Sequence, residues 1–174
     1  MSQWGFLIDQ RLCVGCKACE VACKSRNKLE VGDARLRRVQ RIECGMFPNT
    51  KVITFSMSCM HCAEPACVKV CPANAITKNA EDGTVIANRE KCIGCHYCFF
   101  ACPFGVPQYR EEDGTMIKCD LCADRRAMGL EPACAQVCFN EAIKAGPINE
   151  LSAMAQGKAT LGGYTSNPSV IVIE

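Results

Sequence analysis

The sequence has few of the residues from which most cores and active sites are built. Aromatic residues make up 6% of the chain, with a single tryptophan, and there are 2 histidines. A core packed from side chains alone would therefore be thin. We find no Ser-His-Asp set, no paired catalytic acids, no phosphate-binding loop and no dinucleotide glycine motif. Nothing predicts a site for an organic substrate or catalysis by this chain on its own.

Targeting and membrane-spanning patterns are missing too. Residues 1–9 lack a basic region followed by a long apolar run, so we expect no export signal of the chain's own. No apolar segment approaches the length needed to span a bilayer. No basic run is longer than Arg37-Arg38, which argues against a nucleic-acid partner.

Cysteine, by contrast, is abundant, with 17 residues in a chain of 174. Such a density indicates either disulfides or metal sites, and disulfides need an oxidising compartment that the chain has no signal to reach. Sixteen of the 17 fall into four groups: Cys13-x2-Cys16-x2-Cys19-x3-Cys23, Cys59-x2-Cys62-x4-Cys67-x3-Cys71, Cys92-x2-Cys95-x2-Cys98-x3-Cys102 and Cys119-x2-Cys122-x11-Cys134-x3-Cys138.

The third group, followed by Pro103, has the spacing by which bacterial ferredoxins hold iron–sulfur clusters. Three of its thiolates fit one tight loop, in which Gly94 leaves room for the inorganic core. The fourth, Cys102, lies about one helical turn further and so points at a different centre. Group four alone would also suit zinc, which prefers separated pairs. Its ending, Ala142-Ile143 after Cys138, parallels Ala75-Ile76 after Cys71 and favours iron–sulfur.

The formal net charge of +2 counts every cysteine as neutral. Sixteen thiolates around four cluster cores would contribute roughly −8, which gives about −6 for the loaded protein. We therefore interpret the 20 Lys and Arg residues as compensation for buried anionic clusters.

Between the cysteine groups the pattern predicts short elements. We expect a strand over residues 5–12, a helix running on to Lys28, a hairpin with arms 35–43 and 51–58, and a strand over 84–88. Residues 148–156 suit a short amphipathic helix, 157–168 a loop and 169–173 a final strand that closes a sheet edge. Cys44 has no partner at ligand spacing and is expected to be a small apolar residue. His61 and His96 are expected to fill their loops rather than bind iron.

Taken together, these features resemble the electron-transfer subunit of dimethyl-sulfoxide-reductase-type molybdoenzymes. Besides the four groups, the matching segments are Gly5-Phe-Leu-Ile-Asp9, Cys67-Val-Lys-Val-Cys71-Pro72, Pro103-Phe-Gly-Val-Pro-Gln-Tyr109 and Gly146-Pro-Ile-Asn-Glu-Leu151. One departure is Phe139, which stands where the family has proline after the last cysteine. A second is a short tail after Ile173, which weakens the case for a membrane partner.

The resemblance implies an α+β fold of two interlocked ferredoxin-like modules, each carrying two [4Fe-4S] clusters, with a β-hairpin insertion. The outer module would comprise residues 1–48 and 109–174, and the inner module residues 49–108. The implied ligand sets are Cys13, Cys16, Cys19 and Cys138 for cluster 1; Cys119, Cys122, Cys134 and Cys23 for cluster 2; Cys59, Cys62, Cys67 and Cys102 for cluster 3; and Cys92, Cys95, Cys98 and Cys71 for cluster 4.

The resemblance further implies a large catalytic subunit with molybdenum or tungsten, and a membrane anchor or another electron carrier as redox partner. The chain would stay in the cytoplasm, or be exported folded with a partner that bears a twin-arginine signal. Three alternatives remain open from sequence: a free polyferredoxin, a hydrogenase or formate-lyase accessory carrier, and a zinc storage or structural protein.

Overall fold

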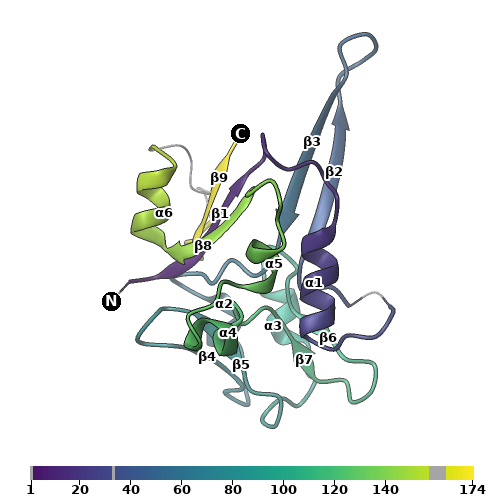
Figure 1. Cartoon of the computed structure of the whole chain (residues 1–174). Coiled ribbons are helices and arrows are strands. Elements are labelled where there is room, and N and C mark those ends of the chain that lie inside the picture. Colours follow the sequence, from purple (N-terminus) through teal and green to yellow (C-terminus); the bar gives the residue numbers. More distant parts are fainter. Residues whose placement is uncertain (1, 33, 157–163) are drawn as a thin grey trace.

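The computed structural model describes residues 2–32, 34–156 and 164–174, and it combines six short helices with small sheets (Figure 1). The helices are α1 (Ala18–Arg26), α2 (Ala66–Lys69), α3 (Tyr97–Phe100), α4 (Ala123–Ala127), α5 (Ala133–Gln136) and α6 (Ile148–Met154). The strands are β1 (Trp4–Asp9), β2 (Arg38–Cys44), β3 (Lys51–Met57), β4 (Ile76–Lys78), β5 (Val85–Ala87), β6 (Gln108–Tyr109), β7 (Met116–Ile117), β8 (Ile143–Pro147) and β9 (Val170–Ile173). This mixture agrees with the expected α+β class.

The largest sheet has three strands in the order β8-β1-β9. β1 pairs antiparallel with β8 and parallel with β9, so residues from both ends of the chain lie side by side. β9 therefore closes a sheet edge, as the sequence predicts for residues 169–173. β1 is shorter than expected and ends at Asp9, whose carboxylate accepts hydrogen bonds from Arg11.

Side chains of β1 alternate between two cores, as strand geometry requires. Phe6 and Ile8 pack into the main core, which also contains the cysteines Cys19, Cys59, Cys119 and Cys134. Leu7 points to the opposite face, where it packs with Leu151 of α6 and with β9. β1 thus lies between the cysteine-rich main core and a smaller core that α6 covers.

The predicted hairpin is present, and it projects away from the body of the molecule (Figure 1). β2 and β3 pair antiparallel from Arg38 opposite Met57 to Cys44 opposite Lys51. Cys44 is exposed near the tip, where its thiol lies 3.6 Å from the Lys51 carbonyl oxygen. The hairpin base lies against the cysteine-rich interior, because Phe55 and Met57 pack on the main core.

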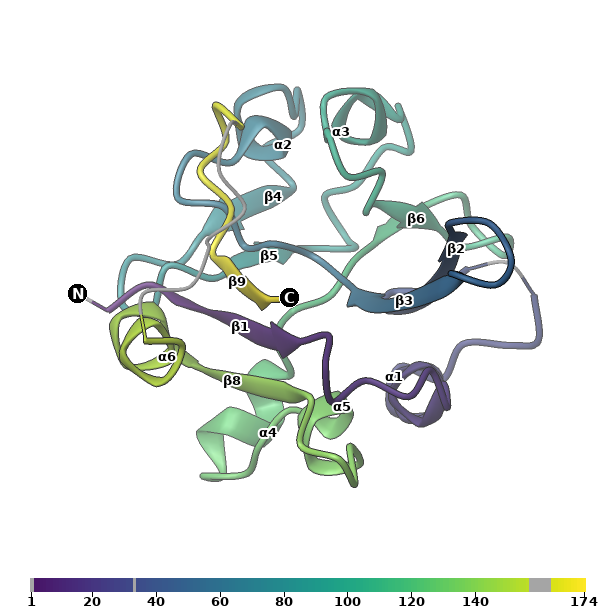
Figure 2. The ribbon, with the colours of Figure 1, turned by 90° about the horizontal axis from the view of Figure 1, so that it is seen from above.

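The remaining elements form two similar arrangements around the cysteines. α1 packs against α5, and α2 packs against α3; Figure 2 shows the two pairs at opposite sides of the molecule. β4 pairs with β5 and β6 with β7 as two-stranded sheets. None of the helices in the described ranges is long and apolar enough to cross a membrane.

We predict that Gly5→Ala destabilises the sheet at the β1–β9 junction. A Cβ at residue 5 would overlap the backbone carbonyl of Ser169, and that carbonyl accepts a hydrogen bond from the Phe6 amide. Backbone atoms cannot move aside as a flexible side chain can, so overpacking should cost about 1–3 kcal/mol. The measurement is the thermal unfolding midpoint of the cluster-loaded chain.

Gly32→Ala is the matched control, because its Cβ would meet the Glu111 carboxylate at an ordinary 3.8 Å. An unfolding midpoint that falls equally for Gly5→Ala and Gly32→Ala would contradict this account of the junction.

Candidate metal centres

Each cysteine group ends on a helix that separates its third cysteine from its fourth by one turn. α1 contains both Cys19 and Cys23, and α5 contains Cys134 and is followed by Cys138. α2 contains Cys67 and α3 contains Cys98, with the fourth cysteine again just beyond the helix. One turn displaces a side chain by about 5 Å along the helix axis. In bacterial ferredoxins with this spacing the fourth cysteine binds the other cluster, which leads us to expect the partners of each fourth cysteine in another group.

The two helix pairs bring cysteines of different groups together. Because α1 packs on α5, the cysteines of groups one and four approach one another; α2 and α3 do the same for groups two and three. The loop before a helix turns sharply into it, since Lys17 and His96 have left-handed backbone conformations with φ of 63° and 65°. The helix of group one ends at Arg26, two residues before the Lys28 that we expected.

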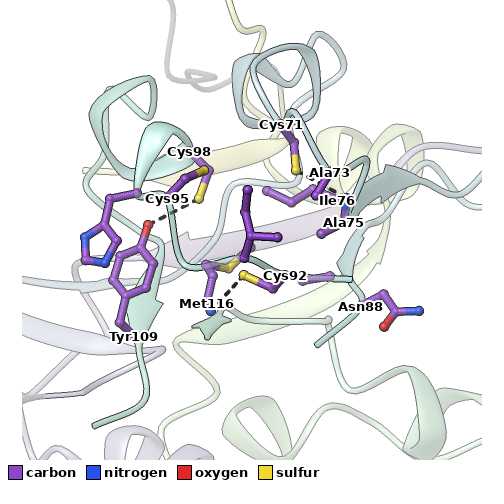
Figure 3. Close-up of a pocket in the computed structure, with 13 residues that line it drawn as sticks. Cys71, Ala73, Ala75, Ile76, Asn88, Cys92, Cys95, Cys98, Tyr109 and Met116 are labelled. Atoms are coloured by element: carbon purple, nitrogen blue, oxygen red, sulfur yellow. Dashed lines mark hydrogen bonds between the residues drawn. The ribbon is translucent and has the colours of Figure 1, made fainter. Parts of the chain in front are cut away.

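A first cavity is lined by Cys92, Cys95 and Cys98 of group three together with Cys71 of group two (Figure 3). Three donors reach its sulfurs. The amides of Ala75 and Met116 lie 3.2 and 3.3 Å from Cys71 and Cys92, and the Tyr109 hydroxyl lies 3.4 Å from Cys98.

A second cavity has the corresponding composition in the other helix pair. Cys13, Cys16 and Cys19 of group one line it together with Cys138 of group four. The hydroxyl of Ser56 on β3 lies 3.4 Å from the Cys19 sulfur. Each of the two cavities is thus lined by three cysteines of one group and one cysteine of another group.

The other eight cysteines lie more deeply in the molecule. Burial, followed by the neighbouring Cys59 sulfur, raises the pKa of Cys67 to about 12, and Cys102 and Cys62 act in the same direction. These four sulfurs therefore lie close enough to influence one another.

The last four cysteines, Cys23, Cys119, Cys122 and Cys134, also lie close to one another. Burial and then Cys134 raise the pKa of Cys23 to about 12, with Cys122 acting in the same direction. Burial and then Cys23 raise the pKa of Cys119 well above its ordinary value. The structure thus brings Cys23 of group one close to group four.

The donor set fits iron–sulfur clusters. Four cysteine sulfurs around an apolar space are the ligands of a [4Fe-4S] cluster, and the amides and hydroxyls beside them supply the hydrogen bonds that tune such clusters. Among the described residues, no three His, Cys, Asp or Glu side chains converge on a site for a single ion. When bound, the clusters would supply one-electron redox chemistry.

Both histidines are engaged with neighbouring protein groups. Nδ1 of His61, a fully buried ring, accepts a hydrogen bond from the Val85 amide at 3.0 Å. Burial, and then the charge of Lys118, lower its pKa well below the ordinary value, so the ring is neutral. His96 stacks on Tyr109 with ring centroids 3.6 Å apart. These contacts agree with the expectation that the histidines fill their loops.

The sequence analysis missed several groups beside the cysteines. Ser56 and Tyr109 contact ligand sulfurs from elements that carry no cysteine motif, and Lys118 reaches the Cys59 sulfur from the residue before group four. Gly94 has two further reasons to be glycine. A Cβ there would lie 2.9 Å from the Gly114 carbonyl oxygen, and its φ is +66°. Loop packing and the left-handed backbone thus favour glycine, while the expected room for a cluster stays a prediction.

Comparisons with known proteins identify the family. The family model of the 4Fe-4S dicluster domain matches residues 50–148. The chain is 44% identical over 158 residues to a component of the anaerobic dimethyl sulfoxide reductase of Escherichia coli K12, covering 86% of this chain and 76% of the relative. It is 35% identical over 189 residues to a subunit of the sulfite dehydrogenase of Allochromatium vinosum, covering 97% and 79%.

The formate dehydrogenase iron-sulfur subunit of Haemophilus influenzae is 37% identical over 166 residues, covering 86% of this chain and 53% of that protein. These relatives and the cysteine-lined cavities decide against the zinc alternative. The chain belongs to the 4Fe-4S dicluster family and is an electron-transfer iron–sulfur subunit of the dimethyl-sulfoxide-reductase type.

Proposed function

We propose that the chain relays electrons through four [4Fe-4S] clusters whose ligand sets cross between cysteine groups. The observation that carries this proposal is the composition of the two cavities, in which one cysteine comes from a different group than the other three. The proposed sets are those implied by the sequence: Cys13, Cys16, Cys19 and Cys138; Cys119, Cys122, Cys134 and Cys23; Cys59, Cys62, Cys67 and Cys102; and Cys92, Cys95, Cys98 and Cys71.

The crossed sets would tie the chain into two interlocked modules. In the outer module, groups one and four exchange their fourth cysteines through the α1–α5 pair. In the inner module, groups two and three do so through α2–α3. We propose the module boundaries given by the sequence analysis, residues 1–48 with 109–174 and residues 49–108. The pairing of β1 with β8 supports this division, because it joins the two segments of the outer module.

The proposed order of the relay follows from which sets are neighbours. Burial raises the pKa of Cys19 of the first set and the sulfur of Cys134 of the second set acts in the same direction, and both cysteines belong to the main core. The pKa of Cys119 of the second set is raised by burial and then by Cys23, and the sulfur of Cys59 of the third set acts in the same direction. Cys119 and Cys59 are therefore neighbours too. The third and fourth sets share the helices α2 and α3. Electrons would therefore pass along the order one, two, three, four, or in reverse.

The protein's own contribution is to hold, insulate and tune the redox centres. Burial of the four cysteines of the second set excludes water, and amides such as those of Ala75, Met116 and Leu121 donate to ligand sulfurs. Hydrogen bonds to sulfur and solvent exclusion are known controls on cluster potential.

We propose a large molybdenum- or tungsten-containing subunit as the catalytic partner, with a membrane anchor or another carrier at the other end of the relay. The support is that the relatives are named as parts of dimethyl sulfoxide reductase, sulfite dehydrogenase and formate dehydrogenase. The compartment stays a prediction: the cytoplasm, or export in the folded state with a twin-arginine-bearing partner. Mass spectrometry of proteins that copurify with the native chain tests the partner.

We predict that Cys23→Ser perturbs the cluster held by group four. Cys119→Ser and Cys134→Ser should therefore remove the same electron paramagnetic resonance signal as Cys23→Ser, with about one cluster's iron lost in each variant. Cys138→Ser should instead group with Cys13→Ser. If Cys23→Ser removed the signal that Cys13→Ser removes, the loops would be self-contained and the crossed ligation wrong. Cys44→Ser is the matched control, because this exposed thiol belongs to none of the sets.

We predict a three-iron cluster when Cys95 is replaced by serine. Cys95 is exposed and is the second cysteine of its loop, so three sulfurs remain at that site. A new three-iron signal, together with the loss of about one iron per chain, should appear in electron paramagnetic resonance and iron analysis. Unchanged iron content and an unchanged spectrum would remove Cys95 from the proposed fourth set.

We predict that folding depends on the clusters. Metal binding at a structural site can contribute on the order of 10 kcal/mol, comparable with the whole stability of an ordinary domain. Anaerobic chelation of iron should therefore abolish most of the ordered secondary structure seen by circular dichroism. A metal-free chain that kept the spectrum of the loaded protein would show that side-chain packing alone suffices.

A further inference from the structure

Two buried cations lie among the proposed ligands. Arg37 is 2% exposed and Lys118 is 5% exposed. Among the described residues, neither forms an ion pair with a carboxylate. Arg26 and Arg126 differ in this respect, because they pair with Asp120 and Asp82 respectively. A buried and unpaired charge is costly unless something nearby carries the opposite charge.

Arg37 is held in place by neutral partners. Its guanidinium donates to the Ser56 hydroxyl at 3.0 Å and to the Ser58 hydroxyl at 2.9 Å, and it lies 4.5 Å from the centre of the Phe6 ring. Ser56 in turn contacts the sulfur of Cys19 at 3.4 Å. The guanidinium is thus fixed one hydroxyl away from a ligand of the proposed first set.

The opposite charge around Arg37 would come from cysteine sulfurs once these bind iron. Burial opposes its charge, yet its pKa is raised, because the sulfurs of Cys134 and Cys119 favour the cation. Cys19 and Cys23 act in the same direction. Three of these four cysteines belong to the proposed second set and Cys19 belongs to the first. Arg37 therefore lies where the first two sets meet.

Lys118 occupies the corresponding place between the second and third sets. Its ammonium donates to the Cys59 sulfur at 3.5 Å, to the Cys119 carbonyl oxygen at 2.8 Å and to the Val85 carbonyl oxygen. These three acceptors match the three N–H donors of a protonated lysine. Cys59 is in the proposed third set and Cys119 in the second, so the ammonium lies between the modules.

We propose that Arg37 and Lys118 are potential-setting residues, whose buried positive charges raise the reduction potentials of the proposed clusters one and two and of clusters two and three. One-electron reduction adds a negative charge to a site, and a fixed cation nearby stabilises that reduced state. The electron comes from the neighbouring centre, which is oxidised by one electron, and no proton transfer is required. This inference rests on the proposed ligand sets.

The second proposed set is the one that both cations face. The fourth set is different, because its described sulfur donors are two amides and a tyrosine hydroxyl, none of them charged. The fourth set therefore serves as an internal reference. A substitution that acts through charge at Arg37 or Lys118 should leave its potential unchanged, whereas general loosening of the fold should not.

The experiment is a redox titration of the cluster-loaded protein, followed by electron paramagnetic resonance, for wild type, Arg37→Gln, Arg37→Lys and Arg41→Gln. Glutamine removes the charge but keeps donors for Ser56 and Ser58, and lysine keeps the charge. Arg41→Gln is the matched control, because it removes the same charge from an exposed position on β2, with its side chain 66% exposed. Iron analysis of the wild-type protein comes first. Fewer than four clusters would contradict the proposed function, independently of any effect of the Arg37 variants on potentials.

For Arg37→Gln we expect the potentials of clusters one and two to fall. The expected fall is at least tenfold in the equilibrium constant for reduction, about 59 mV for one electron. Arg37→Lys should restore most of that shift, and Arg41→Gln should leave all potentials unchanged. Cluster four should keep its potential throughout.

For Lys118→Gln we expect a shift of the same size and direction at clusters two and three, with the exposed Lys51→Gln as control. Unchanged potentials in Arg37→Gln and Lys118→Gln would overturn the proposal, as would an equal shift of all four clusters. If neither neutral variant retained its clusters, the cations would be needed for assembly, and the proposed role in setting potentials would also be overturned.

Discussion

The structure depends on one constraint, the single helical turn that separates the third from the fourth cysteine in each group. In bacterial ferredoxins with this spacing the fourth cysteine binds the other cluster, and in the proposed sets every loop is completed by a cysteine from another group. In the proposed sets this requirement holds α1 against α5 and α2 against α3. The aromatic content of 6% is then sufficient, since metal–sulfur bonds replace much of the packing that an ordinary core provides.

The main sheet and the cysteine loops support each other. Phe6 and Ile8 of β1 pack directly against buried cysteines, so the apolar strand forms a wall of the interior in which the central sets lie. The opposite face of that strand is covered by α6. The four cysteines of the proposed second set are all buried, while the two cavities lie nearer the surface, with Cys16 and Cys95 exposed. A relay with buried middle centres and accessible ends suits transfer between two partners.

Much of this architecture could be predicted from the sequence, because the signals are local. The loops follow from cysteine spacing, the hairpin from the turn at residues 45–49, and the edge strand from the apolar run 169–173. The buried cations could not be predicted. Arg37 and Arg38 are adjacent, yet Arg37 is fully buried beside serines of a distant segment whereas Arg38 reaches the Phe104 and Gly105 carbonyl oxygens. The side chains of adjacent residues point to opposite faces of a strand. Only tertiary packing decides which of the two faces lies in the interior.

The parallel pairing of β9 with β1 has a consequence for biosynthesis. The chain is made from its N-terminus, and domains begin to fold during synthesis. β1 emerges first but acquires its second neighbour only when residues 170–173 have been made. Groups two and three can meet much earlier, because both are complete once Cys102 has emerged. In the proposed division, the inner module could therefore take up iron while the outer module is still incomplete, and the last strand would close the sheet edge only after all four cysteine groups have been made.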